Sequence, residues 1–285
     1  ARKLRSYLRT LPGDRDVILS RQEHIGQLLT NHSLMAEIDS VLSRVPDVNR
    51  ALSRLMSGRG TPRDLRNVSD FLIILDTVKN VGKKLDPELS DKFKQINTHD
   101  NFAHELKSAL NDDLPTFFRD GNVIKTGFDI SLDNMRNLSN GSIETIAQLQ
   151  AQYINETGIN TLKIKYNNIL GYFVEVPSSR ADTLMAPESG FIHRQTMAGN
   201  MRFTTTKLIN LDNDIRSASE KASAIENEII DRLIEGIREI SNDLMNTADL
   251  VADIDVWCSL AEIADLYSWV RPEITNSNEF DIVGG

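Results

Sequence analysis

The sequence contains a single cysteine, Cys258, in 285 residues, and it contains no long apolar run. One cysteine excludes an intrachain disulfide and is typical of a protein in a reducing compartment. The longest purely apolar segments, such as Phe71–Leu75, are far shorter than the roughly 20 residues that a membrane helix needs. No apolar signal-peptide core follows the basic residues Arg2, Lys3 and Arg5. We therefore expect a cytoplasmic protein without a membrane segment.

Proline and glycine are also scarce, and most of them mark breaks between long helical patterns. From Arg2 to about Leu110 the apolar residues recur mostly three or four positions apart. This spacing predicts five or six short helices in a compact bundle. Within it, Thr61 is expected to cap a helix whose first residue is Pro62.

In the middle of the chain the spacing of the apolar residues changes from a helical pattern to the alternation of a strand. A long helix is expected from about 130 to 156, with Gly141 as its weak point. The segment 162–166 then alternates apolar with basic residues, and 171–176 is β-branched and aromatic. These patterns predict two strands joined as a hairpin through turn residues at 167–168. No clear period follows from 191 to 203.

The last region has the most regular pattern. Thr205 or Thr206 is expected to cap a helix from 207 to about 245, which would be about 55–60 Å long at ~1.5 Å per residue. The helix at 130–156 is its expected antiparallel partner. The apolar residues of the helix from 207 to about 245 form a heptad seam that becomes less regular toward its end. They are Leu208, Leu211, Ile215, Ala218, Ala222, Ile225 and Ile229, then Leu233, Ile237, Ile240 and Leu244.

These patterns together predict a mainly α fold with a small inserted β-containing domain (α+β). We expect a helical bundle as a base, two long antiparallel helices, and a tip that bears a β-hairpin. The chain starts without methionine and closes on a strand-like run before two glycines. We therefore expect it to be a piece of a longer protein.

Charge is unevenly distributed along the chain. The formal net charge of −9 argues against nucleic-acid binding by the chain as a whole. Residues 158–207, however, hold six cations and three carboxylates, a net of +3, so the remainder carries −12. Phosphate contacts use cations together with small hydrogen-bond donors, and the segment 194–207 is rich in both. The alternative is that these charges only keep an exposed tip solvated.

Motifs for other chemistries are weak. No phosphate-binding loop occurs, and the five histidines lack metal-ligand spacing. Two Asp-x-Asp pairs suggest a metal-dependent nuclease, but residues i and i+2 of a helix do not face each other. Cys258 is expected to be a buried, inert thiol. The residues considered and set aside as sites are His99 with His104, Asp212 with Asp214, Asp253 with Asp255, and the strand aromatics Tyr166, Tyr172 and Phe173, which we expect in the core of the tip.

Four segments together resemble the MutS family of DNA mismatch repair proteins. Residues 162–176 are similar to the hairpin of its clamp domain, and 194–205 to its Arg-Gln-Thr…Arg-Phe-Thr-Thr stretch. Residues 59–65 resemble a short motif of its lever domain. The closing 279–285 resembles the entry to its ATPase domain. The likeness extends in order over essentially the whole chain.

The resemblance implies a domain order and a function. It implies a first part of the lever domain at 1–140, a clamp domain at 141–210, a second part of the lever at 211–275 and the start of an ATPase domain at 276–285. Such a fragment would clamp the backbone of double-stranded, mismatched DNA without sequence preference, and its lever helices would couple the clamp to the ATPase.

The resemblance also implies cofactors and partners. The fragment itself would be no enzyme and would hold no cofactor or metal, whereas the full-length protein would be a DNA-dependent ATPase using ATP and Mg²⁺. Its partners would be a second MutS subunit and MutL, in the bacterial cytoplasm and not at a membrane.

Two departures from the family pattern concern the contact residues. The family's usual Asn aligns with Gly199, and its Pro-Glu is replaced by Thr206-Lys207. The residues that we expect to contact the DNA backbone are Lys163, Lys165, Asn167, Asn168, Arg194, Gln195, Thr196, Asn200, Arg202, Thr204 and Lys207. Two alternatives remain open: a coiled-coil interaction module without DNA binding, and a recombination-specialised relative of the same family.

Overall fold

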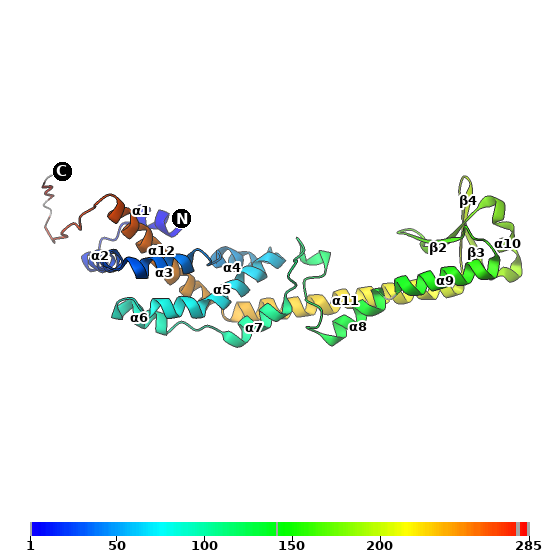
Figure 1. The fold of residues 1–285 in the computed structure, drawn as a ribbon, viewed down its shortest axis with the longest axis horizontal. Helices are drawn as coiled ribbons and strands as arrows, with labels where there is room; N and C mark the ends of the chain where they lie inside the picture. Colours follow the sequence, from blue (N-terminus) through cyan, green and yellow to red (C-terminus); the bar gives the residue numbers. More distant parts are fainter. Residues whose placement is uncertain (1, 141, 278–279, 284–285) are drawn as a thin grey trace. The chain divides into compact units, whose positions relative to one another are not determined.

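The computed structural model describes residues 2–140, 142–277 and 280–283. The chain forms two compact units, one made of Ala1–Val123 with Asp231–Gly285 and the other of Ile124–Ile230 (Figure 1). The described residues are mainly helical and include one four-stranded sheet. This confirms the predicted fold class. The predicted domain boundaries remain predictions.

The first unit is all-helical in its described part. Residues 2–110 form more helices than the five or six predicted, because Asn31 ends one helix and caps the next by accepting a hydrogen bond from the Leu34 amide at 3.0 Å. The seven helices are α1 (Arg2–Arg9), α2 (Arg15–Thr30), α3 (His32–Leu42), α4 (Val48–Met56), α5 (Pro62–Gly82), α6 (Pro87–Lys94) and α7 (Asp100–Ala109).

The rest of this unit comes from the last third of the chain. A short 3-10 helix, η1 (Phe118–Asp120), follows α7, and the unit is completed by the end of α11 (Thr206–Glu239) and by α12 (Ser241–Leu266). Helix α12 packs against α1, α2, α3 and α4. None of the described helices combines the length and apolarity needed to cross a bilayer.

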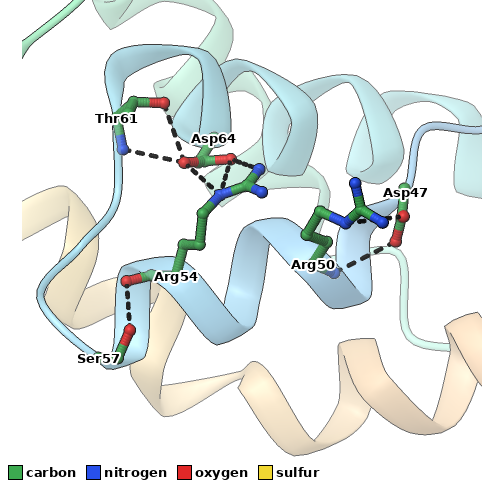
Figure 2. Close-up of polar contacts among 6 residues, drawn as sticks. All are labelled: Asp47, Arg50, Arg54, Ser57, Thr61 and Asp64. Carbon is green, nitrogen blue, oxygen red and sulfur yellow. Dashed lines mark hydrogen bonds and ion pairs between the residues drawn. The ribbon is translucent and has the colours of Figure 1, made fainter.

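The start of α5 is fixed by a carboxylate. Thr61 is the N-cap and Pro62 the first helical residue, as predicted. Asp64 accepts hydrogen bonds from the Thr61 amide and hydroxyl, each at 2.9 Å. Figure 2 shows that Arg54 of α4 reaches the same carboxylate, with its Nε 3.0 and 3.1 Å from the two oxygens. The motif at 59–65 therefore joins α4 to α5.

Cys258 lies buried in α12, as predicted. Burial, with the nearby carboxylates of Asp255, Asp39 and Glu262, raises the pKa of its thiol to about 12. Because only the thiolate reacts, we expect folded protein at pH 8 to be alkylated more than about 100-fold slower than urea-unfolded protein. Iodoacetamide labelling followed by mass spectrometry measures both rates. Equal rates would show that the thiol is exposed.

In its described residues the second unit contains three α-helices, two short 3-10 helices, a four-stranded sheet and the first part of α11. Residue 141, the predicted weak point of one long helix, lies outside the described residues. The bounds are α8 (Ile130–Asn140), α9 (Ser142–Thr157), β1 (Lys163–Asn167), β2 (Gly171–Pro177), η2 (Ser178–Arg180), α10 (Asp182–Met185), η3 (Pro187–Ser189), β3 (Ile192–Thr196) and β4 (Asn200–Thr204).

The sheet consists of two hairpins, of which only the first was predicted. The strand order is β1-β2-β4-β3, and all neighbouring strands are antiparallel. The β3–β4 hairpin lacks a period-2 pattern because a bulge interrupts β3 between His193 and Gln195. In addition, every residue of β3 is exposed, so no apolar alternation marks it.

One face of the sheet packs against helices. Val174, Val176 and Phe203 join Leu149 and Tyr153 of α9 and Leu208 of α11 in one buried cluster. Thr205 caps α11 by accepting a hydrogen bond from the Leu208 amide at 3.0 Å. It also bonds the Tyr153 hydroxyl at 2.6 Å. The opposite face of the sheet is therefore the one available to solvent.

Helix α11 is shorter than predicted but has the expected partner. It ends at Glu239, and Ile240 separates it from α12, so its 34 residues extend about 51 Å at ~1.5 Å per residue.

Within the second unit, Gln152 bonds Lys207 at 2.8 Å and Arg136 bonds Glu226 at 2.8 Å. The contact nearer the start of α11 is made by the later residue of α8–α9, and the contact further along α11 by the earlier one, so α8–α9 lies antiparallel to α11. The seam residues Leu208, Ala218, Ala222 and Ile229 are buried within this unit, which argues against the coiled-coil docking alternative.

A candidate nucleic-acid interface

The strand register aligns four polar side chains across the sheet. Lys163 of β1 pairs with Glu175 of β2, Glu175 with Arg202 of β4, and Arg202 with Gln195 of β3. Directly paired residues of an antiparallel sheet point to the same side. Lys165 and Phe173, two positions along their strands, are paired with each other and share that side. We call these six residues the cationic sheet face.

Glu175 is at the centre of this face. Its carboxylate accepts a hydrogen bond from Lys165 Nζ at 2.6 Å and another from Arg202 Nε at 3.2 Å. The hydrogen bond from Lys165 and then that from Arg202 outweigh desolvation and lower the pKa of Glu175 below its ordinary value. Glu175 therefore remains ionised at neutral pH and keeps both cations close to the sheet.

Arg202 is fixed on three sides. Besides Glu175, its Nη1 donates to Gln195 Oε1 at 3.0 Å, and its guanidinium lies 4.6 Å from the centroid of the Phe173 ring. Phe173 is only 2% exposed, since Arg202 stacks on its ring. Phe173 is therefore buried, as predicted, but on the opposite side of the sheet from the cluster of the second unit.

The other two strand aromatics differ from each other. Tyr172 packs partly against the buried cluster, whereas Tyr166 is 55% exposed. Their rings contact each other at 5.0 Å between centroids. The prediction that Tyr166 belongs to the core was wrong, because it lies on edge strand β1, opposite Tyr172 and near the exposed turn of the hairpin.

Several predicted contact residues lie exposed near the cationic sheet face. Arg194 occupies the bulge of β3, and its side chain, like that of Lys163, makes no ion pair among the described residues. Thr196 is exposed and bonds His193 at 3.0 Å. Asn168 is exposed in the β1–β2 turn. These side chains are accessible to a ligand.

The remaining predicted residues have structural partners. Asn167 closes the β1–β2 turn by accepting from the amides of Ile169 and Leu170 at 2.9 and 2.8 Å. Thr204 is 3% exposed, so it offers almost no surface for a phosphate. Lys207 lies on α11 and donates to Gln152, and Asn200 is half-buried at the start of β4.

The departure at Gly199 has a conformational explanation. Gly199 has φ of 86°, in the β3–β4 turn. Glycine adopts positive φ freely, and asparagine does so more readily than most residues. The carbonyl of Gly199 accepts a hydrogen bond from the Ser178 amide at 3.0 Å. This position therefore sets the turn through its backbone.

The aspartate pairs set aside as a nuclease site have other partners. Asp253 accepts from the Tyr7 hydroxyl at 2.8 Å and pairs with Lys3 at 3.2 Å. Burial and this hydrogen bond raise the pKa of Tyr7 to about 12. Asp212 pairs with Arg216 at 3.4 Å. The described residues contain no group of three or more His, Cys, Asp or Glu side chains that could hold a metal ion.

Sequence reasoning missed Glu175 and Phe173 as the organisers of the cationic sheet face. Glu175 was counted only as a negative charge, and Phe173 only as a core residue. Both contact Arg202, which is 27 positions from Glu175 and 29 from Phe173, so the signal appears only when the register of all four strands is known. The alternation of Lys163, Lys165 and Glu175 in the predicted hairpin could have indicated one shared face.

Comparisons with known proteins agree with this architecture. The chain matches the family model of MutS domain III over residues 1–261. It is 42% identical over 272 residues to a DNA mismatch repair protein MutS of Bartonella tribocorum, covering 93% of this chain and 30% of that protein.

Two further MutS proteins are similar at comparable levels. That of Erythrobacter litoralis is 40% identical over 255 residues, covering 88% of the chain and 29% of that protein. That of Paracoccus denitrificans is 38% identical over 288 residues, covering 100% and 33%. The chain thus spans roughly a third of the length of these curated relatives. With a family match over most of its residues, the chain belongs to the MutS family.

Proposed function

We propose that the second unit binds the phosphate backbone of duplex DNA without reading its bases. The single observation that carries this proposal is the composition of the sheet. Its four strands hold the cations Lys163, Lys165, Arg194 and Arg202 and only one carboxylate, Glu175. Cations and amides that contact phosphates carry no sequence information.

The wider function proposed for the whole protein is DNA mismatch repair. The relatives carry that name, which favours repair over a recombination-specialised role. Helix α11 contributes residues to both compact units, and in this proposal it belongs to the lever that couples DNA binding to an ATPase domain using ATP and Mg²⁺. The proposed partners are a second MutS subunit and MutL in the bacterial cytoplasm.

The proposal is tested with a charge-reversal pair. Lys163→Glu/Arg194→Glu should weaken the salt dependence of binding. The negative slope of log affinity against log salt concentration should become shallower by about two, because each lost phosphate contact removes roughly one unit. Affinity at low salt should fall by about tenfold or more. Anisotropy of a labelled homoduplex, titrated over a salt series, measures both quantities.

The control changes the same charge elsewhere. Lys83→Glu/Lys92→Glu alters two exposed lysines, the C-cap residue of α5 and a residue of α6, and should leave the slope almost unchanged. If the two pairs behave alike, or if the wild-type chain binds no duplex, the sheet is not the contact surface.

A further inference from the structure

The position of Glu175 is unexpected for a surface that binds an anion. It is the only carboxylate in the four strands and lies between cations on the cationic sheet face. A negative charge there would repel a phosphate, and neutralising it should then tighten DNA binding. The contacts of Glu175 lead to the opposite expectation.

Glu175 is held in place and in turn holds its partners. Its side chain is only 13% exposed, compared with 49% for Lys165 and 20% for Arg202. One carboxylate oxygen accepts from Lys165 and the other from Arg202. Long cationic side chains lose much rotamer freedom when they are ordered. Here the ordering takes place within the folded protein, before any ligand arrives.

The guanidinium of Arg202 keeps donors for a ligand. Nε is used by Glu175 and Nη1 by Gln195, whereas Nη2 has no hydrogen-bond partner among the described residues. An Arg fork with a fixed orientation binds a phosphate with geometric specificity. A freely rotating one would first have to be ordered by the phosphate itself.

We propose that Glu175 is a positioning residue, which holds Lys165 and Arg202 as a fixed pair for one backbone phosphate. It acts through these two cations and does not touch the DNA. This inference rests on the proposed function, because it assumes that the cationic sheet face binds DNA.

The test compares two variants that add the same charge. Glu175→Gln should bind labelled duplex about three- to tenfold more weakly than the wild type at the same ionic strength, although the protein becomes more positive. Glu188→Gln makes the same charge change at an exposed residue of η3, outside the sheet. This control should bind as well as the wild type or slightly better.

A second variant, Glu175→Asp, has the same net charge as the wild type, so a difference in binding cannot come from charge. Glu175→Asp retains the carboxylate but withdraws it from Lys165 and Arg202 by one methylene, so binding should again weaken. If Glu175 only repels DNA, Glu175→Asp binds like the wild type. Far-UV circular dichroism establishes whether each variant is folded. If Glu175→Gln does not fold, the binding of Glu175→Asp tests the positioning role of Glu175.

A further measurement reports on position itself. In protein labelled with ¹⁵N-arginine, the Nε–H signal of Arg202 should exchange slowly with water in the wild type and faster in Glu175→Asp. Binding equal to or tighter than the wild type in either Glu175 variant overturns the inference. Absence of duplex binding by the wild type instead overturns the proposed function.

Discussion

Replacing Arg54 by methionine should lower the free energy of unfolding of the first unit, and by clearly more than the loss of an exposed ion pair does. The Asp64 carboxylate would then remain buried, at 1% side-chain exposure, without its cation. Burial by itself raises the pKa of Asp64, and the hydrogen bonds from Arg54 and Thr61 more than offset that effect, so the net pKa lies below the ordinary value. Removing Arg54 removes the largest of the offsetting contributions.

The size of this loss should depend on pH. A lowered carboxylate pKa contributes stability above the pKa of the unfolded state, and this contribution disappears as pH falls through the folded-state pKa. Arg54→Met should therefore differ most from the wild type near pH 7. The difference should shrink as pH falls, because without Arg54 the pKa of the buried Asp64 carboxyl is higher in the variant than in the wild type, so the variant takes up its proton first.

The matched control is on the same helix. Arg50 pairs with Asp47 at 3.6 Å, with side-chain exposures of 60% and 51% (Figure 2). Exposed pairs contribute little, so Arg50→Met should change stability by less than about 0.5 kcal/mol. Both tryptophans, Trp257 and Trp269, lie in the first unit, so their fluorescence in a urea titration follows this unit. Equal losses in the two variants would refute the role assigned to Arg54.

The second large effect is expected at Glu226, a buried carboxylate of α11 beside the heptad seam. It is 6% exposed and accepts hydrogen bonds from the Ile124 amide at 2.9 Å and from Arg136 Nη2 at 2.8 Å. Arg136 Nη1 also donates to the Ile124 carbonyl at 2.9 Å. The Glu226–Arg136 ion pair therefore provides hydrogen-bond partners for both the backbone amide and the backbone carbonyl of the buried Ile124.

Glu226→Leu should destabilise the second unit by about 3 kcal/mol, because Arg136 would keep a half-buried charge without its partner and the Ile124 amide would lose its acceptor. The double variant Glu226→Leu/Arg136→Met should recover part of this loss, since no unpaired ion remains. Recovery should be incomplete, because both backbone groups of Ile124 still lack partners.

Hydrogen exchange measures the effect where fluorescence does not. The second unit lacks tryptophan, so amide exchange in α8 and at Ile124 is the suitable probe. Glu228→Leu, at an exposed position two residues further along α11, is the control and should change protection little. If the double variant is no more stable than Glu226→Leu alone, unpaired charge is not the cause of the loss.

Local sequence signals predicted much of this fold because they depend on neighbouring residues. The cap at Thr61 and Pro62, the β1–β2 hairpin and the seam from Leu208 onward follow from spacing and turn chemistry. The end of α11 at Glu239 was missed because the apolar spacing continues across Ile240 into α12. The β3–β4 hairpin was missed because its bulge removes the alternation that marks a strand.

The candidate site was harder to predict because it depends on pairing between distant strands. Its cations were identified by residue type, but the list also included Thr204, which the fold buries. The central role of Glu175 requires β4 to lie beside β2, and no local pattern indicates that neighbour. Glu226 was missed for a related reason: a carboxylate beside apolar seam residues reads as exposed until its partner Arg136 is known.

The burial of Cys258 has a practical consequence for spectroscopy. Because the only native thiol is held in its unreactive form inside α12, it does not have to be removed before a new cysteine is introduced. A cysteine placed at an exposed position such as Asn168 in the β1–β2 turn would accept a maleimide fluorophore or a nitroxide selectively. The native sequence is therefore already a suitable background for single-site labelling of the sheet.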